Sequence, residues 1–138
     1  MTDKEMEKVE ILLETPYWII DILPKQVPKD SAGQYFAIEN YWRQEPQRSL
    51  VAQKHLNVVL KLNCFMDICP MDGQVNLSPE VLKARFMDEP MNILIGDALI
   101  TRDPYDTYMT IYNADKDLLS LIKTLAAAEG LFVWQPHI

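Results

Sequence analysis

The sequence predicts an α+β domain in which a mainly antiparallel sheet is covered by helices, giving two layers. This prediction rests chiefly on residues 91–134, whose pattern reads as a strand, a turn, a strand, a helix and a strand. The chain has 138 residues, of which 49% are hydrophobic. Residues 1–138 are therefore expected to form one domain that can bury a core without disulfides or metal ions.

A hairpin is predicted at the start of this stretch. Residues 91–100 are largely aliphatic, and residues 105–112 alternate in the period-2 manner of a half-buried strand. The Asp-Pro-Tyr-Asp sequence at 103–106 has the chemistry of a type I turn. Gly96 and Asp97 interrupt the alternation of the first strand, which indicates a bulge or a close backbone approach that could direct Asp97 outward.

A helix and a final strand are predicted after the hairpin. Asn113 is the expected N-cap, because its side-chain oxygen can accept unpaired backbone N–H groups. An apolar stripe then follows at helical spacing and consists of Leu118, Leu119, Leu121, Ile122, Leu125 and Ala126. Gly130 is expected to end the helix, so that residues 131–134 can return to the same sheet as a strand.

Two secondary structures are possible for the N-terminal segment, residues 2–13. Thr2 and Glu5 match a capping box, which favours a helix, whereas residues 9–13 could equally form a strand. A strong strand is predicted at residues 17–23, after Pro16. Its alternation separates two sets of side chains, namely Trp18, Ile20 and Ile22 on one face and Tyr17, Ile19, Asp21 and Leu23 on the other. Asp21 is the only charged residue among them.

Three helices and a strand are predicted in the middle of the chain. Ser31 and Gln34 can form a capping box for the first helix, and a second helix begins near Pro46. The last turn of the second helix could instead be a strand. Residues 64–69 could form that strand. Ser78, followed by a proline, caps the third helix.

The charge balance argues against two classes of partner. The chain carries 20 acidic and 13 basic residues, a net charge of −7, which repels phosphate backbones and anionic lipids. We therefore expect neither a nucleic acid nor a membrane as partner. No apolar run approaches the roughly 20 residues that cross a bilayer, and the charged N-terminus is unlike a signal peptide, so a cytoplasmic location is expected.

The cysteines do not match a zinc motif. Cys64 and Cys69 are five positions apart, and on a strand their thiols would point to opposite faces. A cysteine nucleophile would need His55 as a base and Asp67 or Asp72 to orient it. The simpler interpretation is that the cysteines are small buried hydrophobic residues and that His55 lies at the edge of its helix.

No motif assigns a reaction. The sequence contains no GxGxxG, P-loop or GxSxG pattern. Asp97, Asp103 and Asp106 offer oxygen ligands but lack the spacing of a calcium loop. Asp21 and Asp97 could form a carboxylate pair across the sheet. We therefore predict no cofactor, no metal and no catalytic residue, and favour a protein that is not an enzyme.

Aromatic and acidic residues are the remaining functional signal, since tyrosine and tryptophan contribute large contact areas at binding surfaces. The candidate binding residues are Asp97, Asp103, Asp106, Tyr105, Tyr108 and Trp42. The favoured hypothesis is a non-enzymatic binding or regulatory domain that engages another protein with a basic surface.

Two alternatives remain open. The first is a small ligand-binding domain or enzyme with an aromatic-lined pocket, in which Asp21, Asp97 or His55 is the polar group. The second is a structural homo-oligomer, such as a homodimer, in which the hairpin or residues 131–134 pair across a two-fold axis.

Overall fold

The computed structural model describes residues 2–71 and 73–136. The helices are α1 (Asp3–Leu12), α2 (Tyr35–Trp42), α3 (Gln47–Asn63), α4 (Pro79–Asp88) and α5 (Lys116–Ala128). The strands are β1 (Tyr17–Asp21), β2 (Cys69–Pro70), β3 (Met91–Ile95), β4 (Ala98–Arg102), β5 (Tyr108–Tyr112) and β6 (Phe132–Trp134). The prediction of an α+β fold is confirmed.

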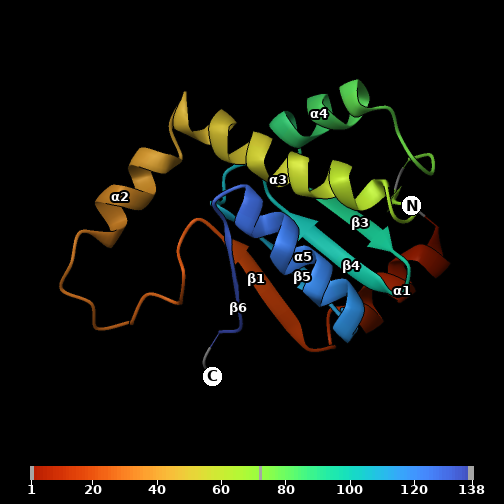
Figure 1. The fold of residues 1–138 in the computed structure, drawn as a ribbon, viewed down its shortest axis with the longest axis horizontal. Coiled ribbons are helices and arrows are strands. Elements are labelled where there is room, and N and C mark those ends of the chain that lie inside the picture. Colours follow the sequence, from red (N-terminus) through yellow and green to blue (C-terminus); the bar gives the residue numbers. More distant parts are fainter. Residues whose placement is uncertain (1, 72, 137–138) are drawn as a thin grey trace.

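The strands of the described chain form one six-stranded antiparallel sheet in the order β2-β3-β4-β5-β1-β6 (Figure 1). β1, from the N-terminal part of the chain, therefore lies between β5 and β6, which come from its C-terminal part. The hairpin and the final strand share this sheet, as predicted. The position of β1 depends on pairing between distant segments, which no local sequence pattern specifies.

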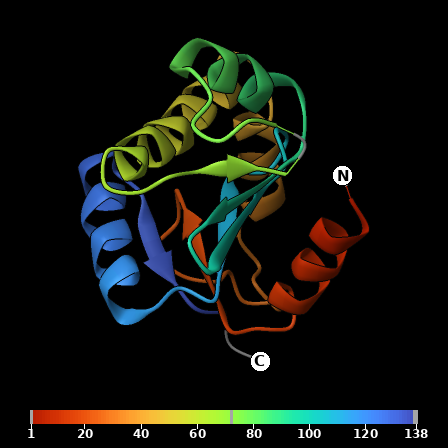
Figure 2. The same cartoon turned by 90° about the vertical axis from the view of Figure 1, so that its right-hand side faces the viewer.

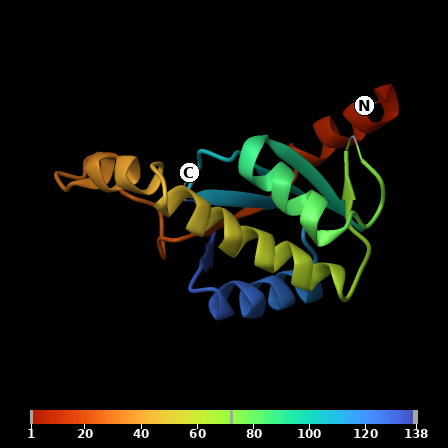
Figure 3. The same cartoon turned by 90° about the horizontal axis from the view of Figure 1, so that it is seen from above.

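Helices α3, α4 and α5 cover one face of the sheet (Figure 1, Figure 3). Ile20, Met109 and Ile111 point toward these helices and are completely buried, as the period-2 alternation of β1 and β5 requires. α1 lies on the opposite side (Figure 2), where Leu12 packs in a small cluster with Leu99. The second face of the sheet is thus covered only in part.

Two predicted helix starts are confirmed in detail. The backbone N–H of Glu5 donates to Oγ1 of Thr2 over 3.1 Å, and the N–H of Thr2 donates to Oε2 of Glu5 over 3.1 Å. α1 is therefore a helix with a capping box, and the strand alternative for residues 9–13 is wrong. Ser78 caps α4 by accepting the N–H of Val81, with proline at the first helical position.

Residues 91–100 form two strands, and the prediction of a single bulged strand is wrong. Gly96 and Asp97 make a two-residue turn between β3 and β4, with Ile95 paired to Ala98. Gly96 has a φ of +57°, a conformation that glycine adopts without steric cost and that tight hairpin turns need. A bulge and a tight turn both favour a residue without a Cβ, so the sequence pattern alone did not separate them.

The predicted turn at 103–106 is present between β4 and β5. The N–H of Asp106 donates to the carbonyl of Asp103 over 3.1 Å, and the Asp103 carboxylate accepts the N–H of Tyr105 over 2.9 Å. β5 begins at Tyr108 rather than at residue 105, because the turn continues through the intervening residues.

Two predicted caps are wrong. Asn113 has a φ of +62° and precedes α5, whose N-cap is Asp115, with its carboxylate accepting the N–H of Leu118 over 2.8 Å. Asparagine tolerates the left-handed conformation, which suits Asn113 to the connection after β5. Ser31 accepts the N–H of Gly33 within a loop, and α2 begins after Gln34 with no side-chain cap.

The predicted strand at 64–69 is reduced to Cys69–Pro70. α3 remains helical to Asn63, and Cys64 is its C-cap residue. The strand alternative for the last turn of α3 is therefore wrong. Because most of the segment is a turn, the argument that the two thiols lie on opposite faces of a strand no longer applies.

Residues 22–46, which we call the arm, connect the end of β1 to the start of α3. Its helix, α2, projects beyond the rest of the protein (Figure 1, Figure 3) and buries none of its residues. Phe36 is 81% exposed, Tyr41 52% and Ile38 49%. The arm therefore carries apolar side chains that the fold itself leaves in contact with solvent.

We expect substitution of Gly96 by valine to lower the free energy of unfolding by about 1–2 kcal/mol, because positive φ is unfavourable for a side chain with a Cβ. No atom lies within 4 Å of the position that a Cβ would take, so the loss should come from backbone strain. Gly96→Asn should cost less, since asparagine tolerates this conformation. Urea unfolding followed by circular dichroism would compare the variants, and equal losses would contradict this explanation.

Candidate functional site

The second face of the sheet carries a row of polar and aromatic side chains, which we call the open face. In β1 and β5 the register pairs Tyr17 with Tyr112, Ile19 with Thr110, and Asp21 with Tyr108. Trp134 of β6 pairs with Ile19 from the other side. The members of the open face are Tyr17, Ile19, Asp21, Tyr108, Thr110, Tyr112 and Trp134.

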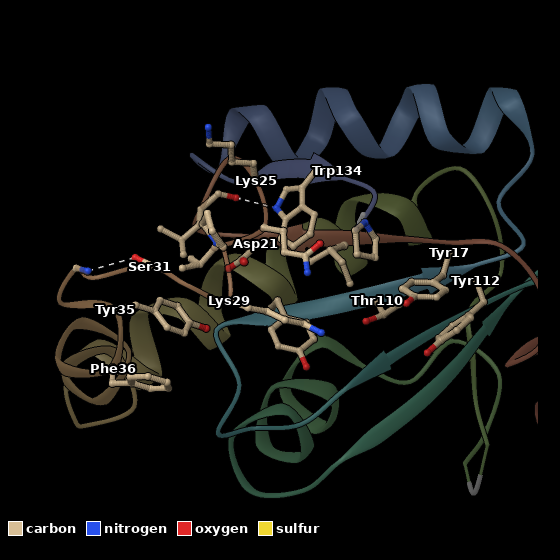
Figure 4. A pocket seen from close by; sticks show the side chains of 18 of the residues that line it. Tyr17, Asp21, Lys25, Lys29, Ser31, Tyr35, Phe36, Thr110, Tyr112 and Trp134 are labelled. Carbon is tan, nitrogen blue, oxygen red and sulfur yellow. Dashed lines mark hydrogen bonds between the residues drawn. The ribbon is translucent and has the colours of Figure 1, made fainter. Parts of the chain in front are cut away.

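A cleft of about 540 Å³ lies between the open face and the first part of the arm. Lys25, Lys29 and Ser31 come from the loop of the arm, and Tyr35 and Phe36 from the start of α2. Figure 4 shows Asp21 between Trp134 and Tyr35, with the other labelled tyrosines farther along the sheet. This volume falls within the range of about 300–1,000 Å³ that is common for ligand pockets.

Local contacts hold several of the aromatic side chains. The rings of Tyr17 and Tyr112 lie 5.3 Å apart at an angle of 43°. The indole N–H of Trp134 donates to the carbonyl of Leu23 over 2.9 Å, which joins β6 to the beginning of the arm. The rings that line the cleft are thus partly ordered before any ligand binds.

Asp21 is the buried acidic group of the cleft. The residue is only 6% exposed, and burial raises the pKa of its carboxyl group to about 6. Its Oδ1 accepts the backbone N–H of Ile22 over 2.7 Å and lies 3.5 Å from the Thr107 hydroxyl. These hydrogen bonds lower the pKa, whereas the negative charge of Glu39 raises it further.

No basic side chain of the described chain pairs with Asp21. The ion pairs formed within residues 2–71 and 73–136 involve other carboxylates, and hydrogen bonds alone oppose the effect of burial. Lys25 and Lys29 line the same cleft but are exposed, and neither forms an ion pair with another described residue. Within residues 2–71 and 73–136, the carboxyl group is therefore buried without a compensating positive charge.

Two smaller hollows adjoin the cleft. One, of about 260 Å³, lies within the arm, between its loop and α2, and is lined by apolar side chains that include Ile22, Ile38 and Trp42. The other, of about 320 Å³, lies near Pro90 and Asn92. This second hollow shares Tyr108, Thr110 and Tyr112 with the cleft, so the concave surface continues across the open face.

Five of the six predicted binding residues lie at the end of the sheet next to the arm. Tyr108 lines the cleft, and Trp42 lines the hollow within the arm. The carboxylate of Asp106 is 3.8 Å from the Arg43 guanidinium. The other two are Tyr105, whose ring lies under Arg48, and Asp103, which stabilises the turn.

Asp97 lies apart from the other predicted residues. It belongs to the turn between β3 and β4, where its carbonyl accepts a hydrogen bond from Asn113, whereas Asp21 ends β1 beside the loop before β5. The two carboxylates occupy opposite ends of the sheet. The proposed Asp21–Asp97 pair is therefore wrong.

The cysteine nucleophile hypothesis finds no geometric support among the residues that can be compared. His55 is completely buried rather than at the edge of its helix, and its Nδ1 accepts the Nε–H of Arg102 over 3.1 Å. Burial and the Arg102 charge lower the pKa of His55 to about 3. Cys64 is exposed, and Asp72 lies outside the described residues.

Sequence analysis identified Asp21 as unusual but did not assemble its surroundings. Tyr17 belongs to the predicted strand at 17–23, whereas no sequence pattern links Lys25, Lys29 and Trp134 to a site. The available signal was that polar or aromatic residues occupy every alternate position of 108–112, and the first and last positions of 17–21. That β1 pairs with both β5 and β6 could not be known from either segment.

Comparisons with protein-family models, with curated proteins and with solved structures find no match. Within the described ranges, no group of three or more histidine, cysteine, aspartate or glutamate residues is placed to hold a metal ion. No helix in these ranges is both long and apolar enough to cross a membrane.

We expect Asp21→Asn to stabilise the protein at pH 8 by about 3 kcal/mol at most and to have little effect near pH 4. The folded-state pKa of about 6 lies above the ordinary value of 3.8, so the folded protein holds the proton more tightly than the unfolded chain does. That contribution is fully present below about pH 4 and is lost as the pH rises through about 6.

Urea unfolding at both pH values would measure this difference. Asp97→Asn is the matched control, because it removes the same charge from an exposed turn. A stability gain for Asp21→Asn that is equal at pH 4 and pH 8 would contradict burial as the cause.

Proposed function

We propose that this chain is a non-enzymatic binding domain that receives a segment of another protein on its open face. The observation that carries the proposal is the one-sided cover of the sheet, which leaves an aromatic cleft around Asp21. Tyrosine and tryptophan are favoured at protein interfaces because they contribute large contact areas with few rotatable bonds.

The extent of the concave surface supports a protein segment as the occupant. The cleft and the hollow near Asn92 share Tyr108, Thr110 and Tyr112, so a bound chain could run across neighbouring strands. At the other end, the exposed Phe36 lines the cleft and extends the apolar surface onto the arm. An extended or helical peptide matches this shape better than a compact molecule does.

Charge supports a basic partner. The net charge of −7 attracts positively charged proteins over distance. Three acidic residues lie near the cleft: Asp21 at the end of β1, Glu39 in α2 and Asp106 in the loop before β5. Among the described residues that line the cleft there is one carboxylate and neither histidine nor cysteine. This composition suits recognition better than acid–base or nucleophilic catalysis.

A site-specific photo-crosslinker placed at position 36 should capture a partner polypeptide in the native cells, whereas the same group at position 65 should not. Phe36 and Phe65 are both well exposed, at 81% and 67%, but only Phe36 lines the cleft. Mass spectrometry of the crosslinked product identifies the partner and the peptide that was bound.

Once a partner is captured, Phe36→Ala should weaken its binding by about tenfold, whereas Phe65→Ala should leave the affinity unchanged. Equal crosslinking from both positions, or no specific product at position 36, would contradict binding at the open face.

The cleft volume favours a second candidate function, the binding of a small molecule. A space of about 540 Å³ that combines aromatic walls with one buried carboxyl group resembles a ligand pocket. Native mass spectrometry of protein purified gently from its own cells should then show an added mass of a few hundred daltons that Tyr108→Ala removes. A bare chain mass would count against this second function.

A further inference from the structure

The uncompensated burial of Asp21 indicates the chemistry of what the cleft binds. An ionised carboxylate is poorly stabilised away from water unless hydrogen bonds or an opposite charge replace its hydration. The Ile22 amide and the Thr107 hydroxyl supply hydrogen bonds on Oδ1. No cation within the described chain completes the arrangement.

The rings around Asp21 suit a positive charge. Tyr108 is its direct neighbour on β5, and Tyr35 and Trp134 lie on two sides of it in the cleft (Figure 4). The faces of tyrosine and tryptophan rings attract cations because of their quadrupole, most strongly for tryptophan. A carboxylate surrounded by aromatic rings therefore combines two favourable contributions to cation binding.

We propose that the cleft around Asp21 is a subsite for an organic cation, either an ammonium or a guanidinium group, with Asp21 as its counterion and the neighbouring aromatic rings as its walls. This inference rests on the proposed function. It adds the chemical identity of the partner's group that lies beside Asp21. In a protein partner, that group is a lysine or arginine side chain.

The lysines at the mouth of the cleft do not reverse this preference. Lys25 and Lys29 are exposed, so water and salt screen their charges. Asp21 is buried, so its charge is screened less. Glu39 adds negative charge close enough to raise the pKa of Asp21. The cleft therefore combines one buried acidic group with two exposed basic ones.

The test compares three small probes that share a phenyl ring and differ in charge: 2-phenylethylamine, 2-phenylethanol and phenylacetate. Each is titrated at pH 7.5 into the full-length, ¹⁵N-labelled protein. The reporters are the indole N–H of Trp134, which is bonded to the Leu23 carbonyl, and the amide of Ile22, which is bonded to Asp21.

The amine should bind about tenfold more tightly than the alcohol, since its ammonium group can form a charge-assisted hydrogen bond with Asp21 that a neutral hydroxyl group cannot match, and phenylacetate should bind weakest. Asp21→Asn should abolish the preference of the amine over the alcohol. Asp97→Asn should retain it, because this variant removes an equal charge from an exposed turn far from the cleft. Circular dichroism confirms that both variants are folded.

Equal affinity for amine and alcohol would overturn the inference. So would no response to the amine, or a preference that persists in Asp21→Asn. These results would leave the crosslinking test at position 36 unaffected, so the subsite and the proposed function can fail separately.

A second pair of probes separates the two sources of the cation. The capped tripeptide Ala-Arg-Ala is compared with the same peptide containing citrulline, the uncharged analogue of arginine. Asp21-dependent preference for the arginine peptide assigns the cation to a protein side chain. Preference for phenylethylamine alone assigns it to a free amine, and equal binding of the two peptides excludes an arginine side chain.

Discussion

The structure depends on the strict alternation of side chains in β1 and β5 within a sheet that carries its main helical layer on one face only. Ile20 and Ile111 are completely buried beneath the helices, and this burial determines the strand register. A slip of one residue would exchange the two faces. The same pairing therefore places Tyr17, Asp21 and Tyr108 together on the open face. The register of β1 and β5 thus determines both the hydrophobic core and the candidate site.

The parts that the core does not require are the ones that form the cleft. α2 is rich in apolar residues but buries none of them, and Asp21 is buried with no cation from the described residues to compensate its charge. Each feature lowers stability in the free protein, because exposed apolar surface and buried charge are both unfavourable in water. Under the proposed function, a bound partner that is apolar near the arm and cationic at Asp21 would relieve both.

Sequence reasoning succeeded where the physics is local and failed where it is not. The capping box of Thr2 and Glu5 and the start of α4 at Ser78 are contained in a few adjacent residues. At Gly96, the local pattern does not distinguish a two-residue turn from a bulge, because both favour a residue without a Cβ. Asp21 was identified by its break in the apolar pattern, but its environment depends on Trp134, which reaches it only through the position of β1 in the sheet.

Hydrogen bonds from Arg48 and Arg102 connect the two faces of the sheet at the end next to the arm. Arg102 donates to the Phe86 carbonyl and Arg48 to the Met87 carbonyl over 2.8 Å. Both carbonyls lie in the last turn of α4, where the partial negative charge of the helix end favours cations. Arg48 also reaches the Pro104 carbonyl, in the loop that continues to Thr107 and hence to Asp21. The packing of α4 on the covered face thus helps to position the loop that donates a hydrogen bond to the acidic group on the open face.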